Sequence, residues 1–355
     1  MTIPYRTGTY LILDNDPELP AEDGNFRSGR RLDPPLRASG SHQLDAAAFA
    51  GAIDRIAGEG PELRRVLVVD LREESHVFVD GRAMSWCADK DWSNVGQSSA
   101  WIARDERCQV EKLETAPDQL LYAIQKDGDG RVQVRGASTL HVTRAETEET
   151  VLADFRSRLT VSYLRLSVTD HCAPEDDVVR VFLEKLGNVD VETWVHFHCH
   201  GGDGRTTTFL TMYDMLNVAK ESPPTATPPD LEYFRQRQLR LFRYDVRPDP
   251  TSRRWQTALS TVRWQRLEAF ARTRSEITPL AVRGPGFRRS RFRRETVSVG
   301  AIRRPGLRAH GCAATGRGNA RSRMSGLQGR CRGYAMSDTG FTAAFCNRPL
   351  DKITS

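Results

Sequence analysis

Residues 194–221 read WVHFHCHGGDGRTTTFLTMYDMLNVAKE and place three local patterns in one continuous stretch. Residues 194–198 are a short, mostly apolar run of the kind that forms a buried strand. A glycine-rich turn follows at residues 199–204, and the residues from Arg205 onward favour a helix that ends before the proline-rich sequence SPPTATPP. A strand, a tight loop and a helix in this order predict one unit of an α/β fold.

The same alternation continues on both sides of this stretch. Buried strands are predicted at RRVLVVDLR and YLRLSV, and helices at residues 44–58, 174–187, 231–245 and 255–273. Residues 100–160 differ, since they alternate in short pieces around the turn sequence KDGDGR. We therefore expect the α/β class, with a central, mainly parallel sheet flanked by helices and a small β-rich insertion at about residues 100–160.

Charge divides the 355-residue chain into a body and a tail. Residues 283–355 contain 15 Arg and one Lys against three acids, a net charge of +13. Because the whole chain carries +6, residues 1–282 carry about −7. The tail is rich in Gly and Arg with little apolar periodicity, so we expect a folded domain at 1–282 and a disordered tail. An arm that contacts nucleic acid or an anionic membrane is the alternative.

The cysteine pattern and the hydropathy of the sequence indicate the cellular compartment in which the protein is expected. The seven cysteines are scattered and include no C-x2-C pair, which argues against a disulfide framework and favours a reducing environment. No apolar run approaches the roughly 18 residues of a membrane span, and no secretory signal is visible at the N-terminus. We therefore expect a cytoplasmic chain without a membrane span.

Cys199 and Arg205 stand six residues apart, which is the C-x5-R spacing of cysteine-dependent phosphatases. A chain of this composition yields about one such pair by chance, so the context carries the argument. Five residues between a strand end and a helix start can curl until their backbone N–H groups cradle a phosphate. The expected phosphate loop comprises His200, Gly201, Gly202, Asp203 and Gly204, whose glycines permit the close approach.

The side chains at the two ends of this loop suit phosphate chemistry. Cys199 faces the inward N–H groups and the helix dipole, so its thiol is expected to ionise and attack phosphorus. Arg205 can hold two phosphate oxygens at once, which Lys cannot. Thr206 can offer its hydroxyl to the sulfur while the sulfur attacks and later departs.

A departing alkoxide needs a proton, and Asp170 is the candidate donor. It lies in VTDHCAP, on an expected loop between a strand and a helix, where a mobile general acid can stand. The alternative is that Asp170 merely caps a turn before Pro174. With the phosphate loop present, we favour the general acid.

Metal and redox chemistry are the competing interpretations of the histidine-rich stretch. His196, His198 and His200 with Cys199 are zinc ligand types, but the first two lie within an expected buried strand and no second ligand pair is present. A thiol redox role needs a resolving cysteine, for which Cys172 is the nearest candidate by topology. We expect neither a metal nor a cofactor.

Several separated motifs resemble those of the protein-tyrosine-phosphatase-like (PTP-like) inositol polyphosphatases, the cysteine phytases of bacteria, some of which pathogens inject into host cells. HFHCHGGDGRTTTF is similar to their active-site signature, and TDHCAP to their general-acid loop. DLREESH with the following Gly, Trp and Asn-x-Gly, and NFR with SGSHQ, also resemble family segments. The resemblance spans about residues 20–275.

The resemblance implies a phosphatase fold with a small partial β-barrel inserted around residues 100–160. It also implies stepwise, metal-free hydrolysis of myo-inositol hexakisphosphate through a phosphocysteine intermediate. By match of motif, Cys199 is the nucleophile, Arg205 the phosphate binder and Asp170 the general acid. Arg27, His171 and His200 are implied to contact neighbouring phosphates.

Two features matter for binding a polyanion. Asp203 puts a negative charge into a loop meant for an anion, so it must point away or lower the affinity for highly charged substrates. Because the body is acidic on average, a local basic cleft is also needed. The candidate arginines for that cleft are Arg27, Arg30, Arg31, Arg37, Arg235, Arg237 and Arg240.

Three functions remain open from the sequence. The first is hydrolysis of inositol polyphosphate monoesters by Cys199, Arg205 and Asp170. The second is a phosphatase for protein phosphotyrosine or phosphoinositide lipids, and the third is a non-catalytic effector that binds phosphorylated partners. The expected partner is an anionic small molecule, the basic tail is a candidate for contact with anionic surfaces, and delivery into a host cell without a signal peptide, as a type III effector, is the alternative location.

Overall fold

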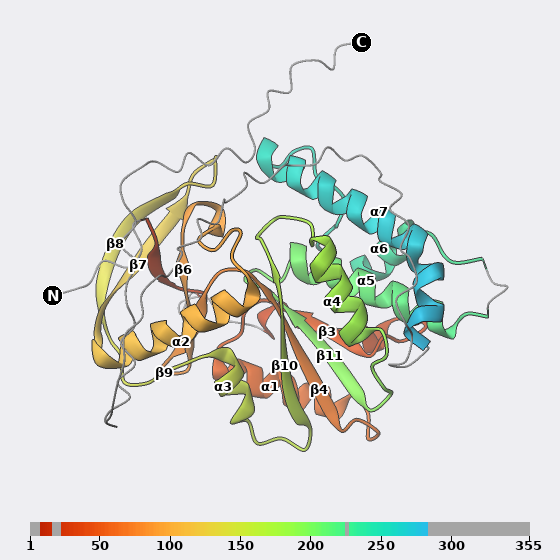
Figure 1. The fold of residues 1–355 in the computed structure, drawn as a ribbon, viewed down its shortest axis with the longest axis horizontal. Coiled ribbons are helices and arrows are strands. Elements are labelled where there is room, and N and C mark those ends of the chain that lie inside the picture. Colours follow the sequence, from red (N-terminus) through yellow and green to blue (C-terminus); the bar gives the residue numbers. More distant parts are fainter. Residues whose placement is uncertain (1–7, 16–22, 224–226, 283–355) are drawn as a thin grey trace, which may run out of the picture. The chain divides into compact units, whose positions relative to one another are not determined.

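The computed structural model describes residues 8–15, 23–223 and 227–282. Its central feature is a five-stranded sheet with the order β10-β4-β11-β3-β2 (Figure 1). The parallel strands are β3 (Ala38–Ser41), β4 (Arg65–Arg72), β10 (Thr160–Val168) and β11 (Thr193–His198), and the short β2 (Arg27–Ser28) runs antiparallel to β3. The mainly parallel sheet that the sequence predicts is confirmed.

Alternation along the strands sends side chains into two cores, one on each face of this sheet. Val68 and Trp194 lie in the core formed with α1 (Ala46–Gly58) and α3 (Glu148–Ala153). Val69 and Phe197 lie in the other core, formed with α4 (Asp176–Leu186) and α5 (Gly204–Glu221). Helices therefore cover both faces of the sheet.

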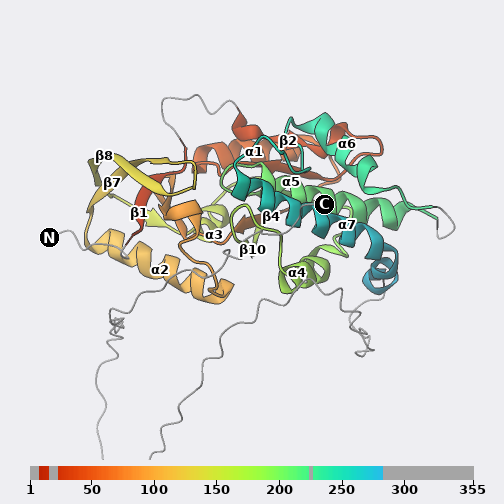
Figure 2. The same ribbon diagram turned by 90° about the horizontal axis from the view of Figure 1, so that it is seen from above.

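Helix α5 is enclosed almost all round near its N-terminus. α6 (Leu231–Leu241) and α7 (Arg254–Val282) pack against it on the side away from the sheet (Figures 1 and 2). Every residue from Arg205 to Leu216 is buried, polar ones included. Because a helix buried on all sides has no solvent-facing stripe, its polar residues must find partners inside the protein.

A second, antiparallel sheet lies beside the central one. Its order is β1 (Tyr10–Leu13), β6 (Arg82–Cys87), β5 (His76–Val79) and β9 (Ala145–Glu146). β7 (Asp118–Lys126) and β8 (Val132–His141) form a separate hairpin, joined to β1 by an edge contact between the rings of Tyr10 and Tyr122 at 5.1 Å. Helix α2 (Ser99–Thr115) packs against the second sheet, and short 3-10 helices are present at Asp23–Asn25, Gly29–Arg31 and Asp89–Asp91.

The region at about residues 100–160 is only partly β structure. The turn sequence KDGDGR does join the two strands of a hairpin, as expected. Helix α2, however, precedes that hairpin, and α3 follows β9 before β10 begins. Ser99–Thr115 lacks the alternation of apolar and polar residues that a half-buried strand shows. Instead, the buried residues Ile102 and Leu113 lie on one face of the helix.

The arginine-rich tail at 283–355 falls outside the described residues, so the expectation about it stays a prediction. Among the helices that the structure describes, none combines the length and the apolar character needed to cross a membrane.

Candidate active site

The expected active-site loop lies where the carboxyl ends of the parallel strands meet. His198, the last residue of β11, stands in register with Ser41 of β3 and Asp70 of β4. Residues 199–203 then leave the sheet, and α5 begins at Gly204. The strand, loop and helix predicted from the sequence are thus formed, at the sheet edge where α/β proteins bind ligands.

Cys199 is buried, and two donors point at its sulfur. The Gly202 N–H donates to Sγ at 3.2 Å, and the Thr206 hydroxyl donates to it at 3.1 Å. Donors directed at a sulfur stabilise the thiolate, which is the nucleophilic form. Cys199 and Thr206 therefore have the arrangement that their predicted roles require.

Gly202 is the position in the loop where glycine is needed. Its φ is +74°, and a Cβ built there would stand 2.5 Å from the backbone nitrogen of His42. The Gln43 N–H also donates to the carbonyl of His200 at 3.0 Å, tying the loop to the end of β3. A larger residue at 202 would push the loop away from β3 and displace its N–H groups.

Arg205 is held in a fixed orientation by Glu74. Nη1 donates to Oε2 at 2.7 Å and Nη2 to Oε1 at 2.9 Å, while Nη1 also reaches the Val168 carbonyl at 3.1 Å. Both side chains are almost completely buried. Burial alone would raise the pKa of Glu74, but the guanidinium groups of Arg205 and Arg72 hold it well below its usual range.

A chain of buried charges continues behind Glu74. Arg72 Nε donates to Glu74 Oε1 at 3.0 Å, and its Nη1 donates to Asp14 Oδ2 at 2.6 Å and to the Gln43 amide oxygen at 2.8 Å. Residues 70–76 were interpreted from the sequence as a strand end that supports the active-site loop from behind. The contacts of Arg72 and Glu74 agree with that interpretation.

Asp170 reaches the active-site arginine from the loop after β10. Its Oδ1 lies 3.0 Å from Arg205 Nη2, and its Oδ2 lies 3.1 Å from Nε2 of His171. The Trp92 indole N–H donates to the Asp170 carbonyl at 3.1 Å, and Arg263 Nη1 donates to the His171 carbonyl at 3.2 Å. The loop that carries the candidate acid is thus tied down by hydrogen bonds from two other segments.

His196 and His198 belong to the buried strand. His196 Nδ1 lies 2.8 Å from the Ser39 hydroxyl, and burial lowers its pKa to about 3, so the ring is neutral. His198 Nε2 lies 2.7 Å from Glu148 Oε1. Within the described residues, no group of three or more His, Cys, Asp or Glu side chains is arranged to hold a metal ion. The two strand histidines serve the core, as the sequence analysis expects.

His200 turns toward acids rather than freely into solvent. Its Nε2 lies 3.7 Å from Asp14 Oδ1 and its Nδ1 lies 3.7 Å from Asp91 Oδ2. Burial alone would lower the pKa of His200, but these two carboxylates raise it. Asp91 in turn bonds Lys126 of the hairpin. The two carboxylates therefore favour the charged form of His200 at the start of the loop.

Arg27 lies beneath the loop. Its Nη2 donates to the Gly202 carbonyl at 2.7 Å and to the Thr207 hydroxyl at 3.0 Å, and the side chain is 4% exposed. Burial lowers its pKa to about 10, against the opposing effects of Cys199 and Asp203. These contacts brace the loop, and direct contact with a substrate phosphate stays a prediction for Arg27.

Two other arginines expected to line a basic cleft are occupied elsewhere. Arg237 is buried and pairs with Asp214 through two bonds of 2.8 and 2.9 Å. Arg235 pairs with Asp245 and Glu232. Arg263, which the sequence analysis did not single out, is instead the buried arginine beside the loop, 2.7 Å from where a Cβ on Gly204 would be.

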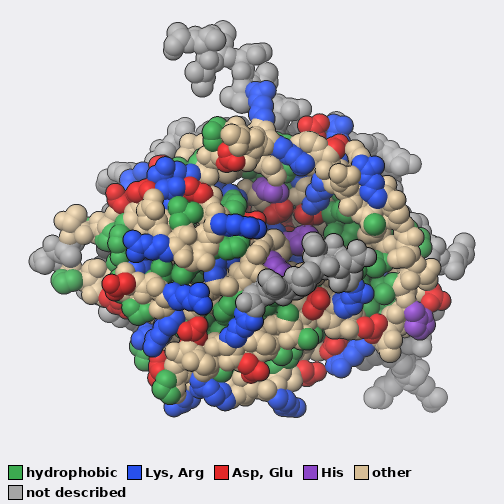
Figure 3. All heavy atoms as spheres, turned by 180° about the vertical axis from the view of Figure 1, so that it is seen from behind, with side chains coloured by type: hydrophobic (Ala, Val, Ile, Leu, Met, Phe, Trp, Pro, Cys, Tyr) green, Lys and Arg blue, Asp and Glu red, His purple; other side chains and the backbone are tan. Residues whose placement is uncertain are grey.

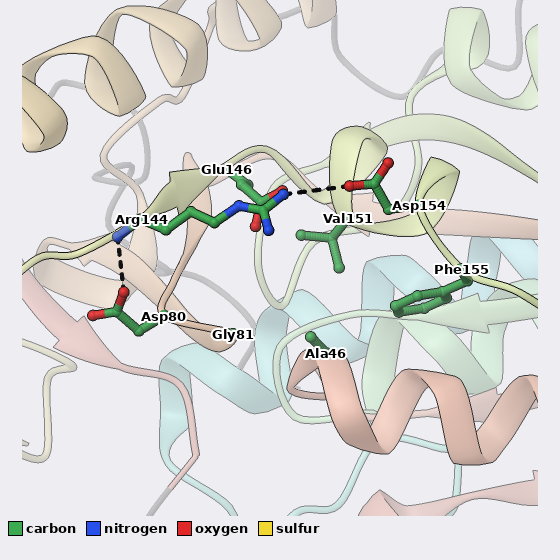
Figure 4. A pocket seen from close by; sticks show the side chains of 8 residues that line it. All are labelled: Ala46, Asp80, Gly81, Arg144, Glu146, Val151, Asp154 and Phe155. Atoms are coloured by element: carbon green, nitrogen blue, oxygen red, sulfur yellow. Dashed lines mark hydrogen bonds and ion pairs between the residues drawn. The ribbon is translucent and has the colours of Figure 1, made fainter.

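The face opposite to that of Figure 1 is hollowed near its centre. Histidine and acidic side chains lie together in the hollow, and Lys and Arg gather around it (Figure 3). A separate pocket of about 370 Å³ lies away from the loop, between the start of α1, the turn after β5, β9 and the end of α3. Figure 4 shows Arg144 at that pocket, already paired with Glu146 and Asp154. The residues that line this pocket include none of the candidate catalytic residues.

Sequence reasoning missed several residues of the site. Asp14 lies in a segment without a local pattern, and Arg263 and its hydrogen-bond partner Tyr244 fall within expected helices that gave no sign of a site role. Asp91 and Trp92 had a signal, because both fall within the family-like segment at 70–96. Each of the others is brought to the loop by tertiary packing alone.

Residues 69–217 match the PTP-like phytase family, which is described by the words inositol hexakisphosphate. Among curated proteins, the chain is 28% identical over 188 residues to the effector protein hopD2 of Pseudomonas syringae pv. tomato. That alignment covers 52% of this chain and 38% of the effector. The chain thus spans well under half of the effector's length.

Solved structures give the same fold. A PTP-like myo-inositol phosphatase from Mitsuokella multacida, in complex with myo-inositol-(1,3,4,5)-tetrakisphosphate, has a TM-score of 0.63 and 24% identity, over 79% of this chain and 47% of that chain. A PTP-like phytase from Bdellovibrio bacteriovorus has a TM-score of 0.56 and 28% identity, over 78% of this chain and 93% of that chain.

These matches agree with the resemblance found in the separated sequence motifs. The match at 69–217 includes Asp70–His76, Asp170 and the whole loop from Cys199 to Arg205. The structural likeness extends beyond it to more than three quarters of the chain. The protein is therefore similar in sequence to the PTP-like phytases over residues 69–217 and has their fold, a central sheet flanked by helices.

Proposed function

We propose that this protein is a cysteine-dependent phosphatase that hydrolyses phosphomonoesters of myo-inositol polyphosphates through a phosphocysteine intermediate. One observation carries the proposal most directly: Cys199 Sγ accepts hydrogen bonds from Gly202 and Thr206 at the loop that leads into Arg205. The similarity to the PTP-like phytases supports the same chemistry.

In the proposed first step, the Cys199 thiolate attacks phosphorus, forming an S–P bond as the P–O ester bond breaks. Asp170 gives its proton to the departing oxygen, so no free alkoxide forms. The guanidinium of Arg205 and the loop N–H groups hold the three non-bridging oxygens as charge shifts among them. Glu74 keeps that guanidinium oriented before the substrate arrives.

In the proposed second step, water attacks the phosphocysteine. Asp170, now ionised, accepts the proton of the water, the new P–O bond forms and the S–P bond breaks. The Thr206 hydroxyl, 3.1 Å from the sulfur, donates to the thiolate as it departs. Inorganic phosphate leaves and the enzyme returns to its initial state.

The inositol polyphosphate class is supported by the description of the matching family and by the ligand in the Mitsuokella multacida structure. His171 and His200 flank the loop and are proposed to contact phosphates next to the reacting one. His200 suits this role because Asp14 and Asp91 favour its charged form. The similarity to an effector supports delivery into another cell as part of the proposal.

The proposal is tested by phosphate release from inositol hexakisphosphate, with a phosphotyrosine peptide and a phosphoinositide as competing substrates. We expect the highest kcat/KM on the inositol phosphate and no turnover by Cys199→Ser. A clear preference for the peptide or the lipid would replace the substrate class while keeping the mechanism. Equal release by wild type and Cys199→Ser on all three would favour the non-catalytic, phosphate-binding function.

A further inference from the structure

Asp203 is a carboxylate inside a loop shaped to hold an anion. It stands between Gly202, whose N–H donates to the Cys199 sulfur, and Gly204, where α5 begins. Its backbone carbonyl accepts from the Thr207 N–H at 2.9 Å. Its side chain does not cap the helix, and among the described residues it makes no hydrogen bond or ion pair with another group. A half-buried carboxylate of this kind is available to act on a ligand.

Charged groups from three segments act on the Asp203 carboxyl. They are Arg27 from β2, His42 from the segment after β3 and Arg243 from the segment after α6, and Asp203 in turn acts on Tyr244. After burial, the charges of Asp203 and Cys199 both raise the pKa of the Tyr244 phenol, against the effect of Arg263. Because Asp203 directly follows Gly202, whose N–H donates to the Cys199 sulfur, its half-buried side chain lies at the rim of the phosphate loop.

Most cations near this rim already have partners. Arg27 donates to the Gly202 carbonyl and Thr207, Arg205 is paired with Glu74, and Lys126 is paired with Asp91. Arg243 is exposed, and no ion pair with it is present in the part of the chain that the structure describes. A second phosphate arriving on the Asp203 side therefore meets one free guanidinium and one carboxylate.

We infer that Asp203 sets the phosphate-density preference of this site, disfavouring esters that carry a second phosphate next to the reacting one. The inference deepens the proposed function and rests on it. The reacting phosphate fills the ring of N–H groups, so a phosphate on the adjacent carbon must lie at the rim. Like charges repel, and the repulsion is stronger where partial burial reduces solvent screening, as it does at Asp203. A substrate whose phosphates are separated by free hydroxyls avoids the contact.

The preference depends on pH through the same carboxyl group. Burial raises the pKa of Asp203, while Arg27, Arg243 and His42 lower it. Below that pKa the carboxyl is neutral and the repulsion is lost, so discrimination against crowded phosphates weakens as the pH falls. His42 also acts on Asp203. Burial lowers the pKa of His42, so its ring becomes positive only in acid, where this charge further weakens the repulsion of a second phosphate.

The test compares inositol hexakisphosphate with a myo-inositol trisphosphate whose phosphates stand on alternate ring carbons. The quantity measured is the ratio of kcat/KM for the crowded substrate to that for the spaced one, between acidic and neutral pH. We expect Asp203→Asn to raise this ratio about tenfold at neutral pH, or about 1.4 kcal/mol. The variant should also flatten the rise of the ratio toward acid. Asp54→Asn, which removes one exposed charge on α1, is the matched control.

An unchanged or lower ratio in Asp203→Asn overturns the inference, and so does an equal change in Asp54→Asn, which would assign the effect to net charge. Binding of both compounds to Cys199→Ser and to Cys199→Ser with Asp203→Asn, measured by calorimetry, separates this inference from the proposed function. If wild type turns over neither compound, the proposed function fails. The affinity ratio then decides about Asp203 alone: a rise of about tenfold supports its role, and no rise removes it.

Discussion

Glu74 and Arg205 form a two-bond pair, with Nη1–Oε2 at 2.7 Å and Nη2–Oε1 at 2.9 Å, in which both side chains are almost completely buried. The two residues are 131 positions apart in the sequence. Because a guanidinium rotates freely when unpaired, this pair fixes the plane of the Arg205 guanidinium. Arg72, bonded to Asp14 on its far side, keeps Glu74 in place.

Glu74→Gln should lower kcat about 100-fold, because its amide NH2 cannot accept a hydrogen bond, so the guanidinium keeps one acceptor of two and Arg205 loses its alignment. Removing the charge from one side of a buried pair also lowers the free energy of unfolding by about 3–5 kcal/mol. Steady-state kinetics and urea denaturation measure the two effects. The control is Glu114→Gln, at an exposed position of α2. A kcat within twofold of wild type would contradict an orienting role for Glu74.

Asp170→Asn should lower kcat by roughly 10²–10⁴-fold while changing KM little, because the variant cannot protonate the leaving oxygen. The loss should shrink on an aryl ester such as p-nitrophenyl phosphate, whose leaving group departs without a proton. Kinetics on both substrates provide the measurement. Equal losses on the two esters would assign Asp170 to loop structure, through its contacts with Arg205 and His171, rather than to proton transfer.

Thr206→Val should slow the second chemical step, because the departing sulfur loses the donor that lies 3.1 Å away. A hydrogen bond to a charged group contributes about 1.5–3 kcal/mol, which corresponds to roughly a 10- to 100-fold effect. We expect a burst of the first product and a phosphocysteine detectable by mass spectrometry. Thr211→Val, a buried exchange of the same shape further along α5, controls for packing. Absence of a burst would place the role of Thr206 elsewhere.

Glu73 makes stability depend on pH. Burial, together with the charge of Glu74, raises its pKa to about 7, compared with 4.5 for the free side chain. The folded state therefore binds more protons than the unfolded state between these values, so this contribution to stability falls as the pH rises from 4.5 through 7. Urea denaturation should show Glu73→Gln gaining stability relative to wild type with rising pH, by at most about 3 kcal/mol. A difference that stays constant with pH would refute the assignment.

Much of the fold was predictable because its signals are local. The strands β4, β10 and β11 read as buried apolar runs, and the glycine-rich turn separates β11 from α5 within a few residues. Helix α2 was missed because residues 100–160 contain a genuine hairpin, whose alternation dominated the interpretation of the whole segment. Periodicity describes one segment at a time and does not show where an insertion changes from helix to strand.

In the candidate site, too, only the residues fixed by local structure were predictable. Cys199, Arg205 and Thr206 were predictable because one loop and the first turn of one helix determine their positions. Arg27 donates to the Gly202 carbonyl beneath the loop, a contact that the sequence did not show, and its contact with a substrate phosphate stays a prediction. The sequence shows a positive charge at this position, but the direction of a guanidinium depends on which acceptors surround it after folding.

The sequence by itself determined the strand, loop and helix around Cys199, because backbone angles, glycine freedom and helix capping act within a few residues. Only the tertiary structure decided which buried charges balance one another: Glu74 against Arg205, Asp14 against Arg72, and Asp203 left without a partner among the described residues. The physical reason is that a charge taken out of water must be compensated by whatever the fold brings near it. Those partners come from distant strands and loops that no local pattern connects.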